Sequence, residues 1–139
     1  MESALHSRTP TSISLPDNCI YLARDGSMRP YAKTTEFFRN AGTGPDLLDY
    51  RMLTLHEVNT PRDLHYPVWE MHTEGDEPLI LSSGSLTVEF RQEGIEQTAP
   101  LRSRSAFIVP AGLWHRLIVH EPSVLIAITP GHNTVHEKG

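Results

Sequence analysis

The sequence predicts an all-β domain built as a closed barrel or a sandwich. Apolar and polar residues alternate over several short segments after residue 47, and turn residues recur between these segments at intervals of about 8–12 residues. No long segment there shows the 3.6-residue period of an amphipathic helix. Short strands at this spacing are typical of barrels and sandwiches rather than of alternating β and α units.

Composition and charge exclude several classes of protein. The chain has 139 residues, 38% of them hydrophobic and 21% charged, as expected for one globular domain. A net charge of −5 without clustered Lys and Arg argues against a nucleic-acid partner. The single cysteine, Cys19, allows no internal disulfide and is expected beside the core, which favours a cytoplasmic location. No segment approaches the roughly 20 apolar residues of a membrane span, so we expect no membrane association.

The domain organisation follows from where the β pattern begins and ends. Residues 1–15 are rich in Ser and Thr and are expected to form a flexible tail, and residues 131–139 a C-terminal tail. Residues 16–47 are expected to form an extended N-terminal arm with a short helix over 36–40, capped by Thr34 or Thr35. The barrel itself is expected over residues 48–130.

About eight strands are expected from alternation and turn residues. They cover residues 19–23, 50–58, 68–72, 79–82, 86–90, 106–109, 113–120 and 124–129. Leu86, Val88 and Phe90 share one face of their strand, which predicts an apolar lumen and a wetter exterior. Residues 124–128 lack alternation, so both faces of this strand should be covered; a second subunit or the N-terminal segment could provide the outer cover.

Four residues have the chemistry of a metal site. Glu70 and His72 are two residues apart, so they project from one face of a strand. Glu77 follows a polar turn that can bring the chain back beside them, and His115 follows a second turn. Carboxylates and neutral imidazoles both donate lone pairs to divalent ions. Glu70, His72, Glu77 and His115 are therefore candidate metal ligands.

Two motifs carry a family resemblance. Residues 70–84 read E-x-H-x4-E-x6-G, and residues 110–115 read P-x-G-x2-H. This pair resembles the two motifs of the cupin superfamily, in which the first motif usually begins with histidine where this chain has Glu70. The resemblance implies a double-stranded β-helix, a jelly-roll-like barrel, with Glu70, His72, Glu77 and His115 as metal ligands. It also implies a homodimer, because homodimers are common in cupins.

The chain departs from the usual family pattern at three further positions. Leu64 and Arg104 stand where the family motifs usually open with glycine, and Val119 stands where many members have asparagine.

The resemblance implies a metal-dependent enzyme that acts on a small polar molecule, with isomerase, lyase and dioxygenase chemistry all open. The alternative is a non-catalytic module that binds a small ligand. If Glu70 turns outward, the site becomes a 2-His-1-carboxylate set. If Glu70 binds, two carboxylates neutralise the dication and favour Fe or Mn, with Zn and Ni still possible.

Other candidate residues are expected to lie outside the site. His56 shares a strand face with Thr54 and could reach the lumen as an acid or base. The remaining residues considered are expected on the exterior: Trp69, Glu74, Asp76, Trp114, Arg116, His120, His132 and His136.

Overall fold

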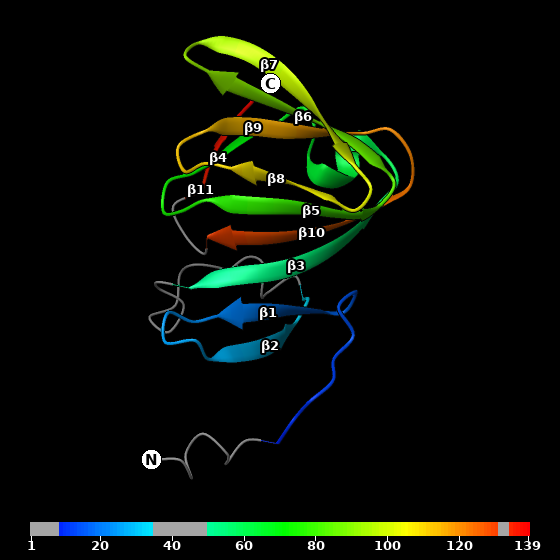
Figure 1. The fold of residues 1–139 in the computed structure, drawn as a ribbon, viewed down its shortest axis with the longest axis vertical. Helices are drawn as coiled ribbons and strands as arrows, with labels where there is room; N and C mark the ends of the chain where they lie inside the picture. The colour runs from blue at the N-terminus through cyan, green and yellow to red at the C-terminus, as the bar shows by residue number, and fades with distance from the viewer. Residues whose placement is uncertain (1–8, 35–49, 131–133) are drawn as a thin grey trace.

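Two antiparallel sheets face each other and enclose an apolar interior (Figure 1). The structure, a computed structural model, describes residues 9–34, 50–130 and 134–139. Its strands are β1 (Asn18–Leu22), β2 (Met28–Ala32), β3 (Arg51–Val58), β4 (Trp69–His72), β5 (Glu77–Ser83), β6 (Ser85–Gln92), β7 (Ile95–Arg102), β8 (Ser105–Val109), β9 (Trp114–Val119), β10 (Ser123–Pro130) and β11 (Thr134–Glu137). One turn of 3-10 helix, Pro61–Leu64, lies between β3 and β4.

The strand order confirms the predicted double-stranded β-helix. One sheet has the order β2-β1-β3-β10-β5-β8, and the other has the order β11-β4-β9-β6-β7. Along the chain from β3 to β10, successive strands cross between the sheets except at the β6–β7 hairpin. Two interleaved sheets of four strands, β3-β10-β5-β8 and β4-β9-β6-β7, are the jelly-roll arrangement.

Period-2 alternation places apolar residues in the lumen, as the sequence predicts. Leu86 and Val88 of β6 are buried in the core, and so are Leu79 and Leu81 of β5 and Leu125 of β10. Burying side chains of this size stabilises the fold by about 1.5–3 kcal/mol each. The core therefore holds the two sheets together across the barrel.

The outer face of the five-stranded sheet is largely polar and charged. Trp69 points outward, as predicted, yet it is only 1% exposed. The guanidinium groups of Arg91 and Arg116 lie 4.0 and 4.1 Å from its ring centre. Arg116 is also paired with Glu89 at 3.2 Å. The two stacked arginines thus cover the indole.

Three strands were not expected from the sequence. β2 and β7 each contain a proline, Pro30 and Pro100, and each lies at the edge of its sheet, where a missing N–H is tolerated. β11 lies within the expected C-terminal tail and pairs with β4. The expected short helix over 36–40 lies outside the described residues. Over the described ranges, no helix is long and apolar enough to span a membrane.

His56 is an ionisable residue on the lumen face of β3. It lies opposite Leu125 of β10, and its face neighbours Thr54 and Val58 are both buried. Burial and the nearby Lys33 ammonium lower the pKa of His56 to about 4. The imidazole is therefore neutral at pH 7, with one nitrogen that donates and one that accepts.

Gly84 connects β5 and β6, and we predict that Gly84→Ala destabilises the fold by about 3 kcal/mol. Its φ is +102°, and a Cβ there would lie 2.6 Å from the Cα of Ser123. Urea unfolding measures the loss. Gly94→Ala is the matched control, because Gly94 also has a positive φ of +76° but open space around its Cβ position. The control should lose only about 1 kcal/mol; equal losses would contradict the packing argument.

We also predict an acid-dependent loss of stability that originates at His56. The unfolded chain binds this proton near pH 6.5, whereas the folded chain binds it only near pH 4. The free energy of unfolding should therefore fall between these two pH values, by roughly 1 kcal/mol per pH unit. Urea unfolding of the metal-free protein at several pH values measures this fall in the free energy of unfolding. The His56→Gln variant should lack the part of the fall that His56 causes. An unchanged pH slope in the variant would show that His56 is not the source.

Candidate metal centre

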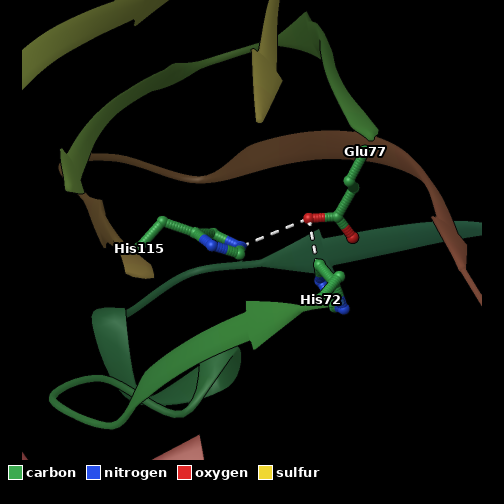
Figure 2. A group of neighbouring side chains, drawn as sticks. All are labelled: His72, Glu77 and His115. Carbon is green, nitrogen blue, oxygen red and sulfur yellow. Dashed lines mark ion pairs between the residues drawn. The ribbon is translucent and has the colours of Figure 1, made fainter. Parts of the chain in front are cut away.

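Three strands of the barrel bring one carboxylate and two imidazoles together (Figure 2). His72 is the last residue of β4, Glu77 is the first residue of β5, and His115 lies on β9. All three residues are nearly inaccessible, with exposures of 1%, 4% and 4%. The period-2 alternation of their strands turns each of them into the lumen.

The ligand atoms of the three residues converge on one point. The Nε2 atom of His72 lies 3.2 Å from Glu77 Oε1, and the Nε2 atom of His115 lies 3.3 Å from the same oxygen. Figure 2 shows both imidazoles directed at this carboxylate oxygen. Together the three residues could hold a metal ion, since one donor atom from each lies within 4.8 Å of the others.

Hydrogen bonds on the far side of each ring fix the imidazoles in this orientation. His115 Nδ1 donates to the Leu113 carbonyl oxygen at 3.1 Å, and a carbonyl can only accept. His72 Nδ1 lies 2.9 Å from the Thr134 hydroxyl, which can accept in the same way. In this tautomer both Nε2 atoms present lone pairs to the site. Such outer partners are typical of metal-binding histidines.

Glu77 is ionised despite its burial. Its second oxygen, Oε2, accepts a hydrogen bond from the Thr129 hydroxyl at 2.6 Å. Burial alone would raise the pKa of Glu77, but the contacts with His115 and His72 lower it to about 2. For His115, burial alone would lower the pKa, but the adjacent Glu77 carboxylate outweighs burial and raises it.

Glu70 lies at the edge of the group. It is opposite His115 in the β4–β9 pairing, and its Oε1 lies 3.2 Å from His72 Nε2. Its side chain is 34% exposed, so it is the most accessible of the four candidate ligands. It does not belong to the mutually close set formed by His72, Glu77 and His115.

The two sequence motifs are joined by hydrogen bonds between their turns. The Gly112 N–H donates to the His72 carbonyl at 2.8 Å, with Gly112 at a φ of +83°. The Ala111 N–H donates to Asp76 Oδ1 at 2.9 Å. Asp76, expected on the exterior, therefore links the turn that precedes His115 to the turn that precedes Glu77.

The donor set fits a divalent cation. His72 Nε2 is fully buried and makes no hydrogen bond with any described residue, although it lies close to two carboxylates. Two ligand atoms that bind one ion at about 2.1 Å are about 3.0–3.4 Å apart. The 3.2–3.3 Å separations in the site match this spacing.

The structure brings together His72, Glu77 and His115 and places Glu70 beside them. Thr129 and Thr134, which position Glu77 and His72, were not expected from the sequence. The only sequence signal for Thr129 is its position at the end of a buried strand. Thr134 lies within the segment 131–139 that was expected to be a tail. His120 is exposed and hydrogen-bonded to Thr87, as expected for an exterior residue.

Comparisons with known proteins find solved structures that are similar to this chain but no sequence family that matches it. No protein-family model matches the sequence, and no curated protein matches it. A cupin-2 domain-containing protein from Shewanella frigidimarina NCIMB 400 is 25% identical with a TM-score of 0.43, over 58% of this chain and 69% of that one. Oxalate decarboxylase from Bacillus subtilis is 17% identical with a TM-score of 0.47, over 62% of this chain and 23% of the decarboxylase.

A third similar structure is that of Fe(II) HppE in complex with substrate. It is 14% identical to this chain with a TM-score of 0.43, over 58% of this chain and 41% of HppE. This chain matches less than half the length of either enzyme. The similarities are too low to carry over an activity or a substrate. The assignment of the fold depends on the jelly-roll strand order and on the position of the two motifs within it. On these grounds, the chain has the cupin fold.

Proposed function

We propose that this protein is a metal-dependent enzyme that acts on a small polar molecule inside the barrel. The observation that carries the proposal is the buried group of His72, Glu77 and His115, with Nε2 atoms and a carboxylate oxygen converging at 3.2–3.3 Å. These residues would hold a divalent ion, and Glu70 would complete the set from the accessible side. When bound, the ion would act as a Lewis acid toward a carbonyl, enol or carboxylate oxygen.

The charge of the site depends on Glu70. With Glu70 as a ligand, two carboxylates balance a dication and the site is neutral. Without it, the His72, Glu77 and His115 set leaves one positive charge. A neutral, oxygen-rich site favours Mn²⁺ or Fe²⁺, and Zn²⁺ and Ni²⁺ also accept this set of donors.

The residues around the site would exclude water and orient the bound molecule. Phe90 lies opposite His115 in the β6–β9 pairing, and its ring centre is 5.7 Å from that of Phe107. Val109 is buried and lies opposite Glu77. These apolar neighbours lower the local dielectric constant, which strengthens the interaction of the polar groups with charge that develops on a substrate.

A non-catalytic module that binds a small ligand is the alternative. The same buried donors would then hold an ion whose open positions capture an anionic ligand. The two functions differ in what happens to a bound molecule: an enzyme accelerates the breaking of a bond, whereas a binder leaves the molecule unchanged.

We predict close to one divalent ion per chain in protein purified without chelators. The double variant His72→Ala/His115→Ala removes two of three buried donors and should contain almost none. Elemental analysis by mass spectrometry measures both proteins. Equal metal content in the two would refute the assignment. Because the ion binds only the folded state, its removal should also lower the melting temperature of the wild type.

Graded variants keep this test informative if the double variant folds poorly. Thr129→Val removes the hydroxyl that donates to Glu77 and should weaken metal binding by about 10–100-fold. Thr98→Val makes the same chemical change at an exposed position on β7 and should have no effect. Titration with Mn²⁺ measures the two affinities.

Glu70 variants separate the enzyme from the binder. Glu70→His restores the usual cupin set, so it should keep the metal but raise the charge of the site by one. Chemistry that depends on a neutral site should then slow by a factor of about 10² or more. A binder should keep its affinity for an anionic ligand within a few-fold or gain some.

Two measurements follow the Glu70 variant. Pyruvate serves as the probe molecule. Proton NMR in D₂O detects proton abstraction as the exchange of pyruvate methyl protons for deuterium. Water-proton relaxation of the Mn²⁺-loaded protein detects the binding of pyruvate. Glu70→Ala is the control: full retention of metal would mean that the site consists of the other three residues. Pyruvate that binds without exchange in the wild type would favour the binder.

A further inference from the structure

Three tyrosine rings pack together at the edge of the six-stranded sheet that β1 and β2 form beyond β3 (Figure 1). The ring centres of Tyr31 and Tyr50 lie 4.4 and 4.3 Å from the ring centre of Tyr21. Tyr21 and Tyr50 are each 5% exposed, whereas Tyr31 is only partly buried and keeps an accessible side. The cluster is a fixed aromatic surface, because closely packed rings cannot change their orientation independently.

The rings line a pocket of about 270 Å³, here called the tyrosine pocket. Pockets for drug-sized ligands occupy about 300–1,000 Å³, so this pocket suits a molecule with a single ring. β1 and β2 do not belong to the eight strands of the jelly roll, so the pocket is an addition to the barrel. Its polar lining comes from β2 and from the turn before it, and consists of Asp25, Ser27 and Arg29.

Arg29 is the charged group of the pocket that is available to a ligand. The Asp25 carboxylate accepts hydrogen bonds from the N–H and the hydroxyl of Ser27, at 2.8 and 2.7 Å. The guanidinium of Arg29 forms no hydrogen bond or ion pair with any residue in the described ranges. Burial, together with the Tyr50 hydroxyl, raises the pKa of Tyr21, so this phenol is neutral. The guanidinium can therefore pair with a carboxylate through two parallel N–H donors.

The tyrosine pocket adjoins the metal centre through a row of cross-strand pairs. Arg29 of β2 is opposite Tyr21 of β1, which is opposite Met52 of β3. Met52 is opposite Thr129 of β10, and the Thr129 hydroxyl donates to Glu77. Opposite residues project from the same face of a sheet, so the whole row lies on the lumen side. Adjacent strands are about 4.8 Å apart, which places Tyr21 about 10 Å from Thr129.

We propose that the tyrosine pocket binds an aromatic carboxylate, with the carboxylate on Arg29 and the ring against the accessible side of Tyr31. The guanidinium supplies charge-assisted hydrogen bonds, and the tyrosines supply an aromatic surface for the ring. An aliphatic acid of the same size would lose the contact between rings, and a neutral aromatic amide would lose the ion pair. The pocket therefore selects for both properties in one molecule.

The position of the pocket also defines a substrate class for the metal centre, and this second statement rests on the proposed function. Arg29 is the outermost residue of the row. A bound aromatic acid therefore points the opposite end of its ring towards Met52 and the proposed ion. The class that fits is an aromatic acid with an oxygen substituent at that far end, since a divalent ion can polarise this oxygen.

Binding of benzoate to the metal-free full chain tests the pocket without the metal centre. NMR titration should give a dissociation constant of about 1 mM, as expected for a ligand this small. Arg29→Gln removes the guanidinium and should weaken binding by about 10-fold or more. Arg102→Gln is the matched control, because it removes the same charge from an exposed position on β7 of the other sheet. The control should bind benzoate as tightly as the wild type.

Two analogues separate the contribution of the charge from that of the ring. Benzamide lacks the charge and should bind about 10-fold more weakly than benzoate, and cyclohexanecarboxylate lacks the aromatic ring and should bind about 3–10-fold more weakly. In Tyr31→Leu the preference for benzoate over cyclohexanecarboxylate should shrink to less than about two-fold. A purely structural role for Tyr31 would leave this preference unchanged.

The Mn²⁺-loaded full chain tests the position of the pocket relative to the metal centre. Paramagnetic relaxation of the benzoate ring protons measures their distance from the ion. Benzoate in the tyrosine pocket should place these protons about 8–14 Å from Mn²⁺, given the spacing of the strands. Direct coordination of the carboxylate to the ion would instead place the nearest ring protons at about 5 Å.

Three results would overturn the proposal. They are the absence of saturable benzoate binding up to about 20 mM, an Arg29→Gln variant that binds benzoate as tightly as the wild type, and ring protons at about 5 Å from Mn²⁺. Failure of the proposed function gives a different result. A chain that holds no Mn²⁺, but binds benzoate with the same dependence on Arg29, would refute the metal centre and support the tyrosine pocket.

Discussion

The Glu77 carboxylate lies in an apolar barrel, and much of the surrounding site compensates for removing its negative charge from water. An uncompensated buried charge destabilises a protein by several kcal/mol. Here the Thr129 hydroxyl donates to one oxygen. The Nε2 atoms of His72 and His115 lie 3.2 and 3.3 Å from the other oxygen, where a bound cation would balance the charge. These groups come from β10, β4 and β9, so the charge is compensated only if all three strands are in register with β5. A slip of one residue would turn a donor out of the lumen.

The backbone conformation or the burial at three positions accounts for the departures from the cupin motifs. Arg104, where the family usually has glycine, adopts a φ of +67° in the exposed turn before β8, where its N–H donates to Leu81. A non-glycine residue can hold this conformation at a cost of about 1 kcal/mol. At the other position where glycine is usual, Leu64, it is the next residue, His65, that adopts the left-handed conformation, with a φ of +64°. Val119, where many members have asparagine, is buried in the apolar core.

Sequence reasoning could predict the barrel because its lumen strands follow a strict alternation, as in Leu86 and Val88. The candidate ligands could be predicted because their spacing matches two motifs. The edge strands β2 and β7 could not be predicted from the sequence, because prolines and polar residues weaken the alternation there. Thr134 could not be predicted either, since its contact with His72 depends on the pairing of β11 with β4, a long-range interaction without a local pattern. Whether Glu70 binds a metal depends on the geometry of its side chain, which the spacing of residues in the sequence does not determine.

The pairing of β11 with β4 makes Thr134 part of the site. β11 has four residues, lies at the edge of its sheet, and delivers the hydroxyl that orients His72. An edge strand this short contributes little stability of its own and belongs to the part of a fold that opens first. If ion binding favours the docked strand, linkage requires that docking favour ion binding by the same factor. A partner that binds β11 would then alter the occupancy of the proposed metal site without contacting its ligands.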